Sequence, residues 1–424
     1  MRIEQPSITS LSFSPASAGL GAGSTDYSYE LTIEANSATA ELTARTAFGA
    51  LYGLESFAQL LTQAGSKIGN GLRLSGSAVR IVDAPMYSWR GLMIDSGRRF
   101  WPADVLKNTL DTMAAVKLNV LHLHASDHCR WAVESKLFPQ LTSNLTSDYA
   151  GHYTQADIKE LIAYGKARGI RIVPEFDLPA HSRGLLPLDI ATNAGKQGGV
   201  MFCQNSSSEG PTHYQHRDQL HNSNATLATL AALLGEMAEL FEDPVMHIGG
   251  DETFVIGQCT KVSTAALQSS LCQLVTDTFN KSVAGWEELL FDADAASPHA
   301  IIQAWGGFTP PNITAKGRYA INSVSHHLYT GPDVGPGKPG PPWLGWARAH
   351  YDIGAGVPAA ERQLLLGGEM AFWTDAYCPT LQCGAFRGPP QPARAMFPPA
   401  QDAAFGKVRI HSVRDPSCAN EFLK

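Results

Sequence analysis

Apolar and polar residues follow two different patterns along the chain, and the change comes near residue 86. In the first part, Tyr27–Ile33 alternates as a half-buried strand does, and Val79–Val82 is a second apolar segment that ends at turn residues. Between them, Thr43–Leu61 carries apolar side chains at helical spacing: Phe48, Leu51, Leu54, Ala58 and Leu61. The pattern predicts a small α+β domain over residues 1–85.

Beyond residue 86 the chain alternates short apolar segments with helical patterns. Eight segments are predicted strands: Gly91–Ile94, Asn119–His124, Ile170–Val173, Val245–Ile248, Val283–Trp286, Ile301–Ala304, Tyr319–Asn322 and Leu364–Leu366. Helices are predicted over Leu106–Val116, from Thr154, where Asp157 completes a capping box, and over Leu227–Phe241. Strands that alternate with helices pair in parallel through right-handed crossovers, so residues 86–424 are predicted to form a closed (β/α)₈ barrel.

An open, doubly wound parallel sheet is the alternative architecture for this pattern. Such sheets usually carry a glycine-rich phosphate-binding turn after the first strand, and none follows Gly91–Ile94. The barrel is therefore preferred, with an atypical closing end. Gly331–Pro342 is rich in Pro and Gly, and the stretch after Asp375 is so rich in proline that no final helix is predicted before Ala400. We expect a shortened C-terminal end.

Composition excludes several classes of function. The chain has 424 residues, 44% of them hydrophobic, which is ample for a core, and charged residues make up only 17%, against roughly 25% in an ordinary soluble domain. The formal net charge is −7 and no Lys/Arg run occurs, so nucleic acid is an unfavoured partner. No apolar stretch reaches the roughly 18 residues that a membrane-spanning helix needs.

Cysteines and glycan acceptors bear on the compartment. The seven cysteines form no paired CxxC clusters and leave one over after complete pairing, so counting them leaves the redox compartment open. Five Asn-X-Ser/Thr triplets exceed the roughly two expected by chance and favour the secretory pathway, lysosomal or extracellular: Asn144, Asn205, Asn224, Asn280 and Asn312. Met1–Phe13 lacks the pattern of a signal peptide, so this interpretation requires a leader upstream of Met1.

Polar residues of the second domain gather at the predicted strand ends. In a (β/α)₈ barrel the carboxyl ends of all strands meet on one face, where active sites are built. One polar residue at a strand-to-loop junction is ordinary, but here acids and tryptophans recur at nearly every junction. These candidate site residues are Asp95, Arg98, Asp127, Glu175, Asp177, His181, Asp251, Glu252, Trp286, Glu287, Trp305, Tyr329, Trp373 and Asp375.

The sharpest motif is His247–Glu252, which reads His-Ile-Gly-Gly-Asp-Glu. Successive strand side chains point to opposite faces, so adjacent carboxylates would not normally serve one site, but Gly249 and Gly250 allow a backbone bend that turns both inward. Two crowded acids cannot ionise equally, and one should hold a proton near neutral pH. The alternative is that Asp251 only caps the following helix.

Paired carboxylates are typical of sugar hydrolysis, yet two acids adjacent in sequence cannot straddle the ring as acid and nucleophile. A sugar with an acetamido group at C2 supplies its own nucleophile, because the amide oxygen attacks C1 while the second carboxylate orients the amide nitrogen. Trp286, Trp305 and Trp373 would suit such a substrate by stacking on its apolar faces, although each is individually typical of core.

Two further residues have both a functional and an ordinary interpretation. Arg98 offers a planar fork to neighbouring hydroxyls and could pair with a carboxylate such as Asp375, or form an exposed salt bridge. His181 could relay to an acid, or be an ordinary hydrogen-bonded histidine at a strand end.

The chain resembles the family-20 β-N-acetylhexosaminidases of the eukaryotic lysosomal type over almost its whole length. After the N-terminal α+β domain, six ordered motifs carry the resemblance: Trp89–Arg98, Lys117–His124 with Asp127, Pro174–His181, His247–Glu252, Gly285–Glu288 and Gly367–Trp373. It implies an exo-acting hydrolase that releases terminal β-linked N-acetylglucosamine or N-acetylgalactosamine with retention.

The resemblance also implies residue roles. Glu252 would be the general acid/base, and Asp251 would orient the acetamido group. His181 would be a supporting residue, and Tyr329 would donate a hydrogen bond to the acetamido oxygen. Sugar contacts would come from Arg98, Asp127, Trp286, Trp305, Trp373 and Asp375. It further implies a Cys203–Cys259 disulfide, a glycan with terminal N-acetylhexosamine as partner, and compatibility with a homodimer for which no interface is visible.

The chain departs from the family at outer-hydroxyl positions. Gly331 stands two residues after the tyrosine where the family has Asp or Asn, and Asp375 stands where it has Glu, which puts the choice between gluco and galacto sugars in doubt. The family's helix near the end is replaced around Ala403–Lys407, and only Cys418–Phe422 resembles its tail.

Two other functions fit the same residues. A glycan-binding protein with weakened catalysis would keep the pocket, and hydrolysis of a chromogenic N-acetylglucosaminide that is abolished in Glu252→Gln would exclude it. A metal-dependent hydrolase is suggested by His122 and His124 on one strand face with His247 nearby. That histidine pair lies in an apolar run more typical of core, so neither a metal nor another cofactor is expected.

Overall fold

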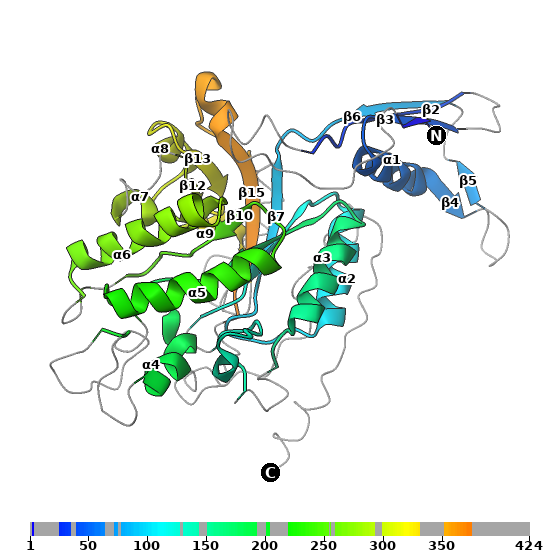
Figure 1. The fold of residues 1–424 in the computed structure, drawn as a ribbon. Coiled ribbons are helices and arrows are strands. Elements are labelled where there is room, and N and C mark those ends of the chain that lie inside the picture. Colours follow the sequence, from blue (N-terminus) through cyan, green and yellow to red (C-terminus); the bar gives the residue numbers. More distant parts are fainter. Residues whose placement is uncertain are drawn as a thin grey trace, which may run out of the picture.

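The computed structural model describes most of the chain up to Thr374. The described residues are 2–3, 25–34, 40–63, 72–74, 78–127, 130–143, 151–192, 201–203, 219–253, 255, 259–292, 299–330 and 352–374. They form a small sheet-and-helix unit and a large barrel, which lie side by side in Figure 1.

The small unit is a four-stranded sheet with one helix against it. Its strands lie in the order β1 (Arg2–Ile3), β3 (Ala40–Ala44), β2 (Tyr29–Ile33) and β6 (Val79–Asp83), and α1 (Ala47–Leu60) leads into the hairpin of β4 (Leu61–Gln63) and β5 (Leu72–Leu74). Side chains along β2 alternate between buried and half-buried, as the sequence pattern predicts.

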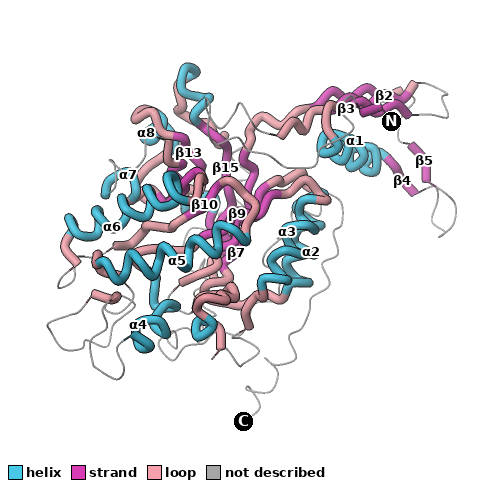
Figure 2. Tube along the Cα trace, viewed as in Figure 1, coloured by secondary structure: helices cyan, strands magenta, loops and turns pink. Residues whose placement is uncertain are grey.

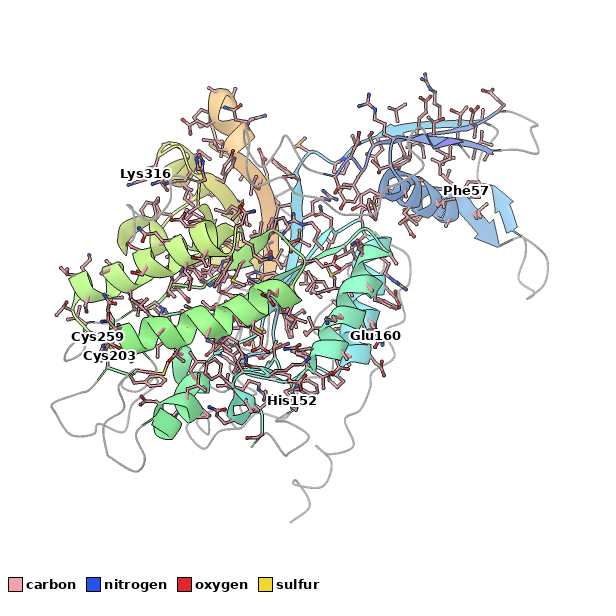
Figure 3. The ribbon with its side chains drawn as sticks, in the orientation of Figure 1. Phe57, His152, Glu160, Cys203, Cys259 and Lys316 are labelled. Carbon is pink, nitrogen blue, oxygen red and sulfur yellow. A yellow bond between two sulfur atoms is a disulfide. The ribbon has the colours of Figure 1, made fainter. Side chains whose placement is uncertain are left out.

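The predicted helix over Thr43–Leu61 is wrong at its start and in the face that it buries. Thr43 belongs to β3, and α1 begins after Thr46, whose side chain caps Gly49 N. Leu51 and Leu54 are 37% and 45% exposed. Instead Gly49 and Gly53 face the sheet, where an added Cβ would lie 2.3 Å from Ser28 O and 2.2 Å from Leu42 Cδ1. The two glycines let the helix approach too closely for the leucine stripe to face inward, while Phe57 packs partly buried at its edge (Figure 3).

The large unit is the predicted (β/α)₈ barrel, and all eight predicted strands are present. They are β7 (Trp89–Asp95), β8 (Val120–His124), β9 (Arg171–Glu175), β10 (Val245–His247), β11 (Ser282–Trp286), β12 (Ile301–Ala304), β13 (Tyr319–Asn322) and β15 (Leu365–Phe372). Consecutive strands pair in parallel, and β15 pairs with both β13 and β7, which closes the sheet. The open-sheet alternative is thereby excluded.

Helices surround the barrel unevenly. The helices are α2 (Ala103–Ala115), α3 (Gln155–Lys166), α4 (Leu186–Thr192), α5 (Asn224–Leu240), α6 (Lys261–Gln273), α7 (Leu289–Asp292), α8 (Pro310–Thr314) and α9 (Ser325–Leu328). Short 3₁₀ or π turns occupy Pro139–Leu141, Ser182–Leu185, Leu274–Thr278 and Ala359–Leu364, and β14 (Tyr329–Thr330) extends the sheet beside β15. The capping box predicted at Thr154 and Asp157 opens α3. Long helices cover the first half of the barrel and one-turn helices its closing half (Figure 2). The predicted changes after Asp375 lie outside the described residues.

The barrel interior has two layers of different chemistry. One apolar residue from each strand fills the end where the strands begin: Trp89, Val120, Val173, Val245, Ala284, Ile301, Ile321 and Leu366. Above this plug, five polar side chains point into the barrel: His122, Glu175, His247, Gln303 and Glu369. The site therefore stands on a buried polar layer that itself rests on an apolar floor.

The small unit contacts the end of the barrel opposite the site. Tyr27 donates a hydrogen bond from its hydroxyl to Gly169 O at 2.8 Å, just before β9 begins. At the start of β7 the guanidinium of Arg90 donates to Tyr52 Oη at 2.6 Å. Because strand N-terminal ends face this interface, the C-terminal ends stay open for chemistry.

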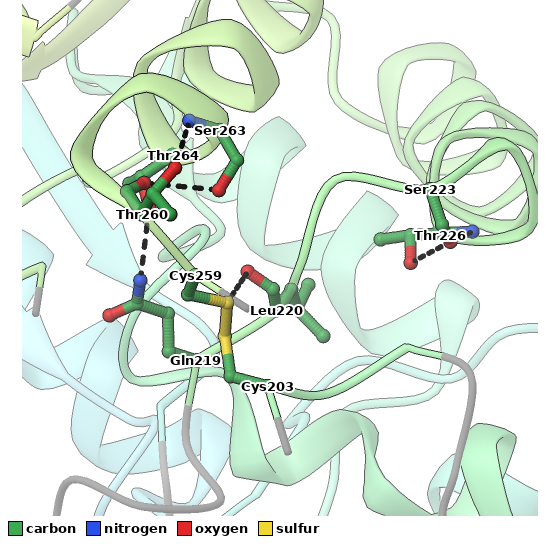
Figure 4. Close-up of a disulfide and its surroundings, with 9 residues drawn as sticks. All are labelled: Cys203, Gln219, Leu220, Ser223, Thr226, Cys259, Thr260, Ser263 and Thr264. Carbon is green, nitrogen blue, oxygen red and sulfur yellow. Dashed lines mark hydrogen bonds between the residues drawn. A yellow bond between two sulfur atoms is a disulfide. The ribbon is translucent and has the colours of Figure 1, made fainter. Parts of the chain in front are cut away.

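The predicted Cys203–Cys259 disulfide is present and has a Cα–Cα distance of 5.8 Å (Figure 4). It joins the segment before α5 to the segment that follows Glu252, beside a hydrogen bond from Gln219 Nε2 to Thr264 Oγ1 at 3.2 Å. No helix among the described residues is both long and apolar enough to cross a membrane.

Candidate active site

The predicted site residues that the structure describes converge at the carboxyl ends of the barrel strands. Arg98 follows β7, Asp127 follows β8, His181 follows β9, the Asp251–Glu252 pair follows β10, Trp286 ends β11, Trp305 follows β12, Tyr329 opens β14 and Trp373 follows β15. Asp375 and Gly331 lie outside the described residues. One face of the barrel therefore collects nine of these side chains from seven different strand ends and β14.

The predicted bend at the two glycines is present. Gly249 and Gly250 have φ angles of 66° and 102°, and Glu252 has a φ of 48°. A side chain at Gly249 is excluded, because its Cβ would lie 1.9 Å from Asp177 Oδ1. Gly250 N then donates to the same Asp177 oxygen at 3.2 Å, which fixes the turn that presents Asp251 and Glu252 to the pocket.

Asp251 is the more enclosed acid of the pair, with 14% of its side chain exposed against 49% for Glu252. Burial raises the pKa of Asp251 to about 6; the Glu252 charge adds to the rise and His181 opposes it. Its Oδ1 atom is buried and accepts no hydrogen bond from the described part of the chain. Asp251 thus keeps one acceptor free for a ligand N–H donor.

Glu252 is joined to a buried aspartate through a histidine. His181 Nε2 lies 3.3 Å from Glu252 Oε2, and His181 Nδ1 lies 3.6 Å from Asp127 Oδ1. Burial opposes the charge on His181, but Asp127, Asp177 and Glu252 outweigh it and raise the His181 pKa well above its ordinary value. The hydrogen bond from this charged imidazole lowers the Glu252 pKa, against the effect of partial burial. The Glu252–His181 pair consequently carries one proton at neutral pH, held mainly on the imidazole.

Arg98 pairs with two aspartates at the rim. Its NH1 lies 3.2 Å from Asp95 Oδ2 and its NH2 lies 3.0 Å from Asp127 Oδ2, and its guanidinium carbon lies 5.0 Å from the centre of the Trp373 ring. The predicted exposed salt bridge is wrong, because Arg98 is 5% exposed. Asp127 is fully buried and contacts Arg98, His124 and His181, so it supports these side chains from behind.

Four aromatic rings form a continuous wall on the other side. The Trp305 and Tyr329 rings stack with centroids 6.4 Å apart and an 11° angle between planes, Tyr329 lies 5.8 Å from Trp373, and Trp373 lies 5.8 Å from Trp286. Trp286 is fully buried, whereas Trp305, Tyr329 and Trp373 are partly exposed. Burial, reinforced by the Asp251 charge, raises the Tyr329 pKa well above its ordinary value, so its hydroxyl keeps a proton to donate.

Glu175 lies in the polar layer beneath the pocket and contacts side chains on both sides of it. It is fully buried and contacts four ring nitrogens: His122 Nε2 at 3.1 Å, His124 Nδ1 at 2.5 Å, His247 Nδ1 at 3.0 Å and Trp286 Nε1 at 2.8 Å. Burial would raise the pKa of Glu175, but His124, His247 and His122 outweigh it and hold that pKa well below its usual range.

Three groups in this region have the spacing of metal ligands. They are His122–Glu175–His247, His124–Asp127–Asp177 and Asp177–His181–Asp251, with ligand atoms within 4.8 Å of one another. In the two deeper groups the histidines already pair with carboxylates of the barrel. Protein-to-protein contacts of this kind account for the buried histidines as core polar residues, as the sequence pattern indicates.

Two acids follow β11: Glu287, a predicted site residue with no role assigned from the sequence, and Glu288, which the sequence marked only as part of the Gly285–Glu288 motif. Glu287 is 4% exposed and accepts hydrogen bonds from four consecutive backbone N–H groups, those of Trp305, Gly306, Gly307 and Phe308. Glu288 accepts from Trp305 Nε1 at 3.0 Å, and burial together with the Asp251 charge raises the Glu288 pKa to about 8. The only available signal was the pair of acids directly after Trp286.

Known proteins match both parts of the chain. Residues 87–380 match the family model described as glycosyl hydrolase family 20, catalytic domain, and residues 2–60 match one described as beta-acetyl hexosaminidase like. The human beta-hexosaminidase subunit beta is 29% identical over 373 residues, which are 82% of this chain and 62% of that protein. The chain thus spans less than two thirds of this relative's length.

Solved structures agree with this assignment. A GH20 beta-N-acetylhexosaminidase from Streptomyces coelicolor A3(2) superposes with a TM-score of 0.66 at 27% identity, covering 82% of this chain and 71% of that one. A mutant beta-hexosaminidase from Streptomyces plicatus in complex with product (GlcNAc) gives a TM-score of 0.66 at 25% identity, covering 85% of this chain and 74% of that one. The family-20 model alone matches more than half of the sequence, and the chain belongs to glycosyl hydrolase family 20.

Proposed function

We propose that the protein is an exo-acting β-N-acetylhexosaminidase that releases terminal β-linked N-acetylglucosamine or N-acetylgalactosamine with retention. The observation that carries the proposal is the pairing of two unlike acids on one bent strand tip: Asp251 with a free buried acceptor atom, and Glu252 with a proton-bearing histidine. Family membership and the relatives' names support the same activity.

The reaction follows from what each group can donate or accept. The acetamido oxygen at C2 attacks C1, the bond from C1 to the leaving oxygen breaks, and Glu252 gives that oxygen a proton that it draws from His181, which leaves Glu252 ionised and His181 neutral. Asp251 accepts the amide N–H and balances the positive charge that develops on the resulting oxazolinium ion. Glu252 then removes a proton from water as it attacks C1 from the leaving-group side, so the configuration is retained.

The remaining residues would bind and orient the sugar. Tyr329 donates a hydrogen bond from its hydroxyl to the acetamido oxygen, and Trp286, Trp305 and Trp373 enclose the acetamido methyl group. Arg98 offers its guanidinium to sugar hydroxyls, with Asp127 acting through Arg98 and His181. Asp375 remains a proposed contact to an outer hydroxyl.

The partner is a glycan or glycoconjugate with a terminal N-acetylhexosamine. We place the protein in the secretory pathway, supported by the five glycan acceptor triplets and by the Cys203–Cys259 disulfide, a bond that forms in oxidising compartments.

The decisive experiment compares 4-nitrophenyl N-acetyl-β-glucosaminide with 4-nitrophenyl β-glucoside, in which a hydroxyl replaces the acetamido group. The protein should cleave the first and act at least about 10³-fold more slowly on the second, because the internal nucleophile is lost. Equal rates on the two substrates would contradict attack by the acetamido group.

The Glu252→Gln variant tests the acid within the same assay. It should lower kcat by about 10² to 10⁴-fold, because it removes proton transfer to the leaving oxygen. The loss should be larger for a disaccharide substrate than for the nitrophenyl glycoside, whose leaving group needs little protonation. An unchanged kcat on the disaccharide would remove Glu252 from the role of general acid.

A further inference from the structure

We propose that Glu287 is a positioning residue that fixes the width of the N-acyl pocket by holding the loop that carries Trp305. The inference rests on the proposed function, since it concerns the wall that would face the substrate's acetamido group. Neither acid after β11 has a role in the reaction described above.

The contacts of Glu287 are concentrated on one short segment. Its Oε2 accepts from Trp305 N at 2.9 Å and from Gly306 N at 3.1 Å, while its Oε1 accepts from Gly307 N and, at 3.2 Å, from Phe308 N. Four consecutive amides therefore converge on one buried carboxyl group that is fixed at the end of the neighbouring strand β11. A carboxylate can accept all four bonds, because it has two oxygens and no donor.

Two glycines form the middle of this segment. Gly306 and Gly307 have no side chains to pack, and a Cβ at either position would lie 3.4 or 3.3 Å from Glu287 Oε1. A Cβ at these distances would be in ordinary or slightly tight contact, so what the glycines add is backbone freedom, and the carboxylate selects one conformation of a glycine-rich loop.

Trp305 is held at three points by this arrangement. Its backbone N–H is bound by Glu287, its backbone carbonyl accepts from Ser325 N at 2.9 Å, and its indole N–H is bound by Glu288. The ring then stacks in parallel on Tyr329. A shift of the loop would consequently move Trp305 relative to Tyr329 and change the space between the aromatic wall and Asp251.

A pocket wall held in one position should make the enzyme selective for the length of the substrate's N-acyl group. A pocket with fixed walls discriminates against one additional methylene by roughly 10- to 200-fold. If Glu287 fixes the wall, replacing its second carboxylate oxygen by an NH₂ group sets a donor against two backbone N–H donors and frees part of the loop. Discrimination between N-acetyl and N-propionyl substrates should then fall.

The test measures kcat/KM on matched nitrophenyl N-acetyl- and N-propionyl-β-glucosaminides for the wild type, Glu287→Gln and a control, Glu236→Gln. Glu236 on α5 is the matched control, because its carboxylate also accepts hydrogen bonds from backbone N–H groups of a loop, those of Lys136 and Leu137, which are not among the proposed site residues. In Glu287→Gln the acetyl-to-propionyl ratio should fall about 10-fold, whereas in Glu236→Gln it should stay within about 2-fold of the wild type.

Hydrogen–deuterium exchange of the Trp305–Phe308 segment provides a readout that needs no catalysis. Exchange should accelerate there in Glu287→Gln and not in Glu236→Gln. Unchanged exchange, or an unchanged acyl ratio in an active variant, would overturn the inference. If the wild type cleaves neither substrate while the exchange difference is found, the proposed function fails and the positioning role stands.

A milder variant keeps the test informative if Glu287→Gln does not fold. Glu287→Asp keeps the charge but withdraws it by one methylene, so it should accelerate exchange in the same segment and lower the acyl ratio by a smaller factor. Wild-type exchange in Glu287→Asp would equally overturn the proposal.

Discussion

Acidic residues hold both sides of the pocket, but they do so in opposite ways. On the acid side, Glu252 and Asp127 face a charged histidine, and their contacts are ion pairs between titratable side chains. On the aromatic side, Glu287 and Glu288 bind backbone and indole N–H groups that do not titrate. The first arrangement sets protonation, and the second sets shape.

The different partners of the acids on the two sides also give these acids different pKa values. Around His181, neighbouring carboxylates raise the imidazole pKa, and the charged imidazole in turn lowers the pKa of Glu252, so each charge is balanced by another. At Glu288, burial and the Asp251 charge raise the pKa to about 8. Substitutions on the acid side should therefore alter kcat and its pH dependence, whereas those on the aromatic side should alter selectivity and stability.

The largest effect is expected from Asp251→Asn. The amide keeps the size of the side chain but removes the negative charge that balances the oxazolinium ion, so kcat should fall about 10³-fold. The wild-type profile of kcat/KM against pH should also show an acid limb near pH 6, where Asp251 takes up a proton, and this limb should disappear in Asp251→Asn. A retained limb at the same pH would assign that titration to another group.

A smaller effect, about 10- to 100-fold in kcat, is expected from His181→Gln. In the wild type the Glu252–His181 pair loses its last proton above the ordinary pKa of histidine, because the His181 pKa is raised. Without the imidazole, Glu252 alone must hold the proton and loses it in the range of carboxylic acids. The alkaline limb should therefore move to lower pH by at least about one unit, as measured by kcat/KM from pH 4 to 9. An alkaline limb that stays in place would show that the pair does not share the proton.

The sequence predicted the barrel and the acid side well because their signals are local. Short apolar segments that alternate with helical patterns identify all eight strands. Gly249 and Gly250 predict the bend that brings Asp251 and Glu252 together. The Cys203–Cys259 disulfide followed from the family resemblance, since spacing alone does not determine pairing.

The partners of Arg98 and the role of Glu287 were harder to predict, for different reasons. Asp375, the partner suggested for Arg98, lies outside the described residues, and Arg98 pairs with Asp95, three residues before it, a local option that the sequence already offered. Glu287 binds amides 18 to 21 residues away in the chain, and backbone N–H groups leave no residue-type signal. The inward face of α1 was mistaken because glycines, not leucines, mark it.

The smallest effect on catalysis is expected from Glu288→Gln, which should also stabilise the folded protein. The folded protein keeps this carboxyl protonated up to about pH 8, while the unfolded chain releases its proton near the ordinary value of 4.5. The wild type therefore loses stability as pH rises between these two values and levels off above them. The glutamine retains an acceptor for Trp305 Nε1 and has no such loss, so Tm in Glu288→Gln should exceed that of the wild type by a margin that grows from pH 5 to pH 8. The free energy of unfolding at pH 8 should rise by about 1 to 2 kcal/mol after allowance for solvent screening. The kcat at pH 6 should stay within about 3-fold of the wild type. A Tm difference that does not change with pH would mean that Glu288 ionises normally. The contrast between acids whose pKa values are lowered or raised by neighbouring charges at His181 and an acid kept neutral by burial on the aromatic side would then be lost.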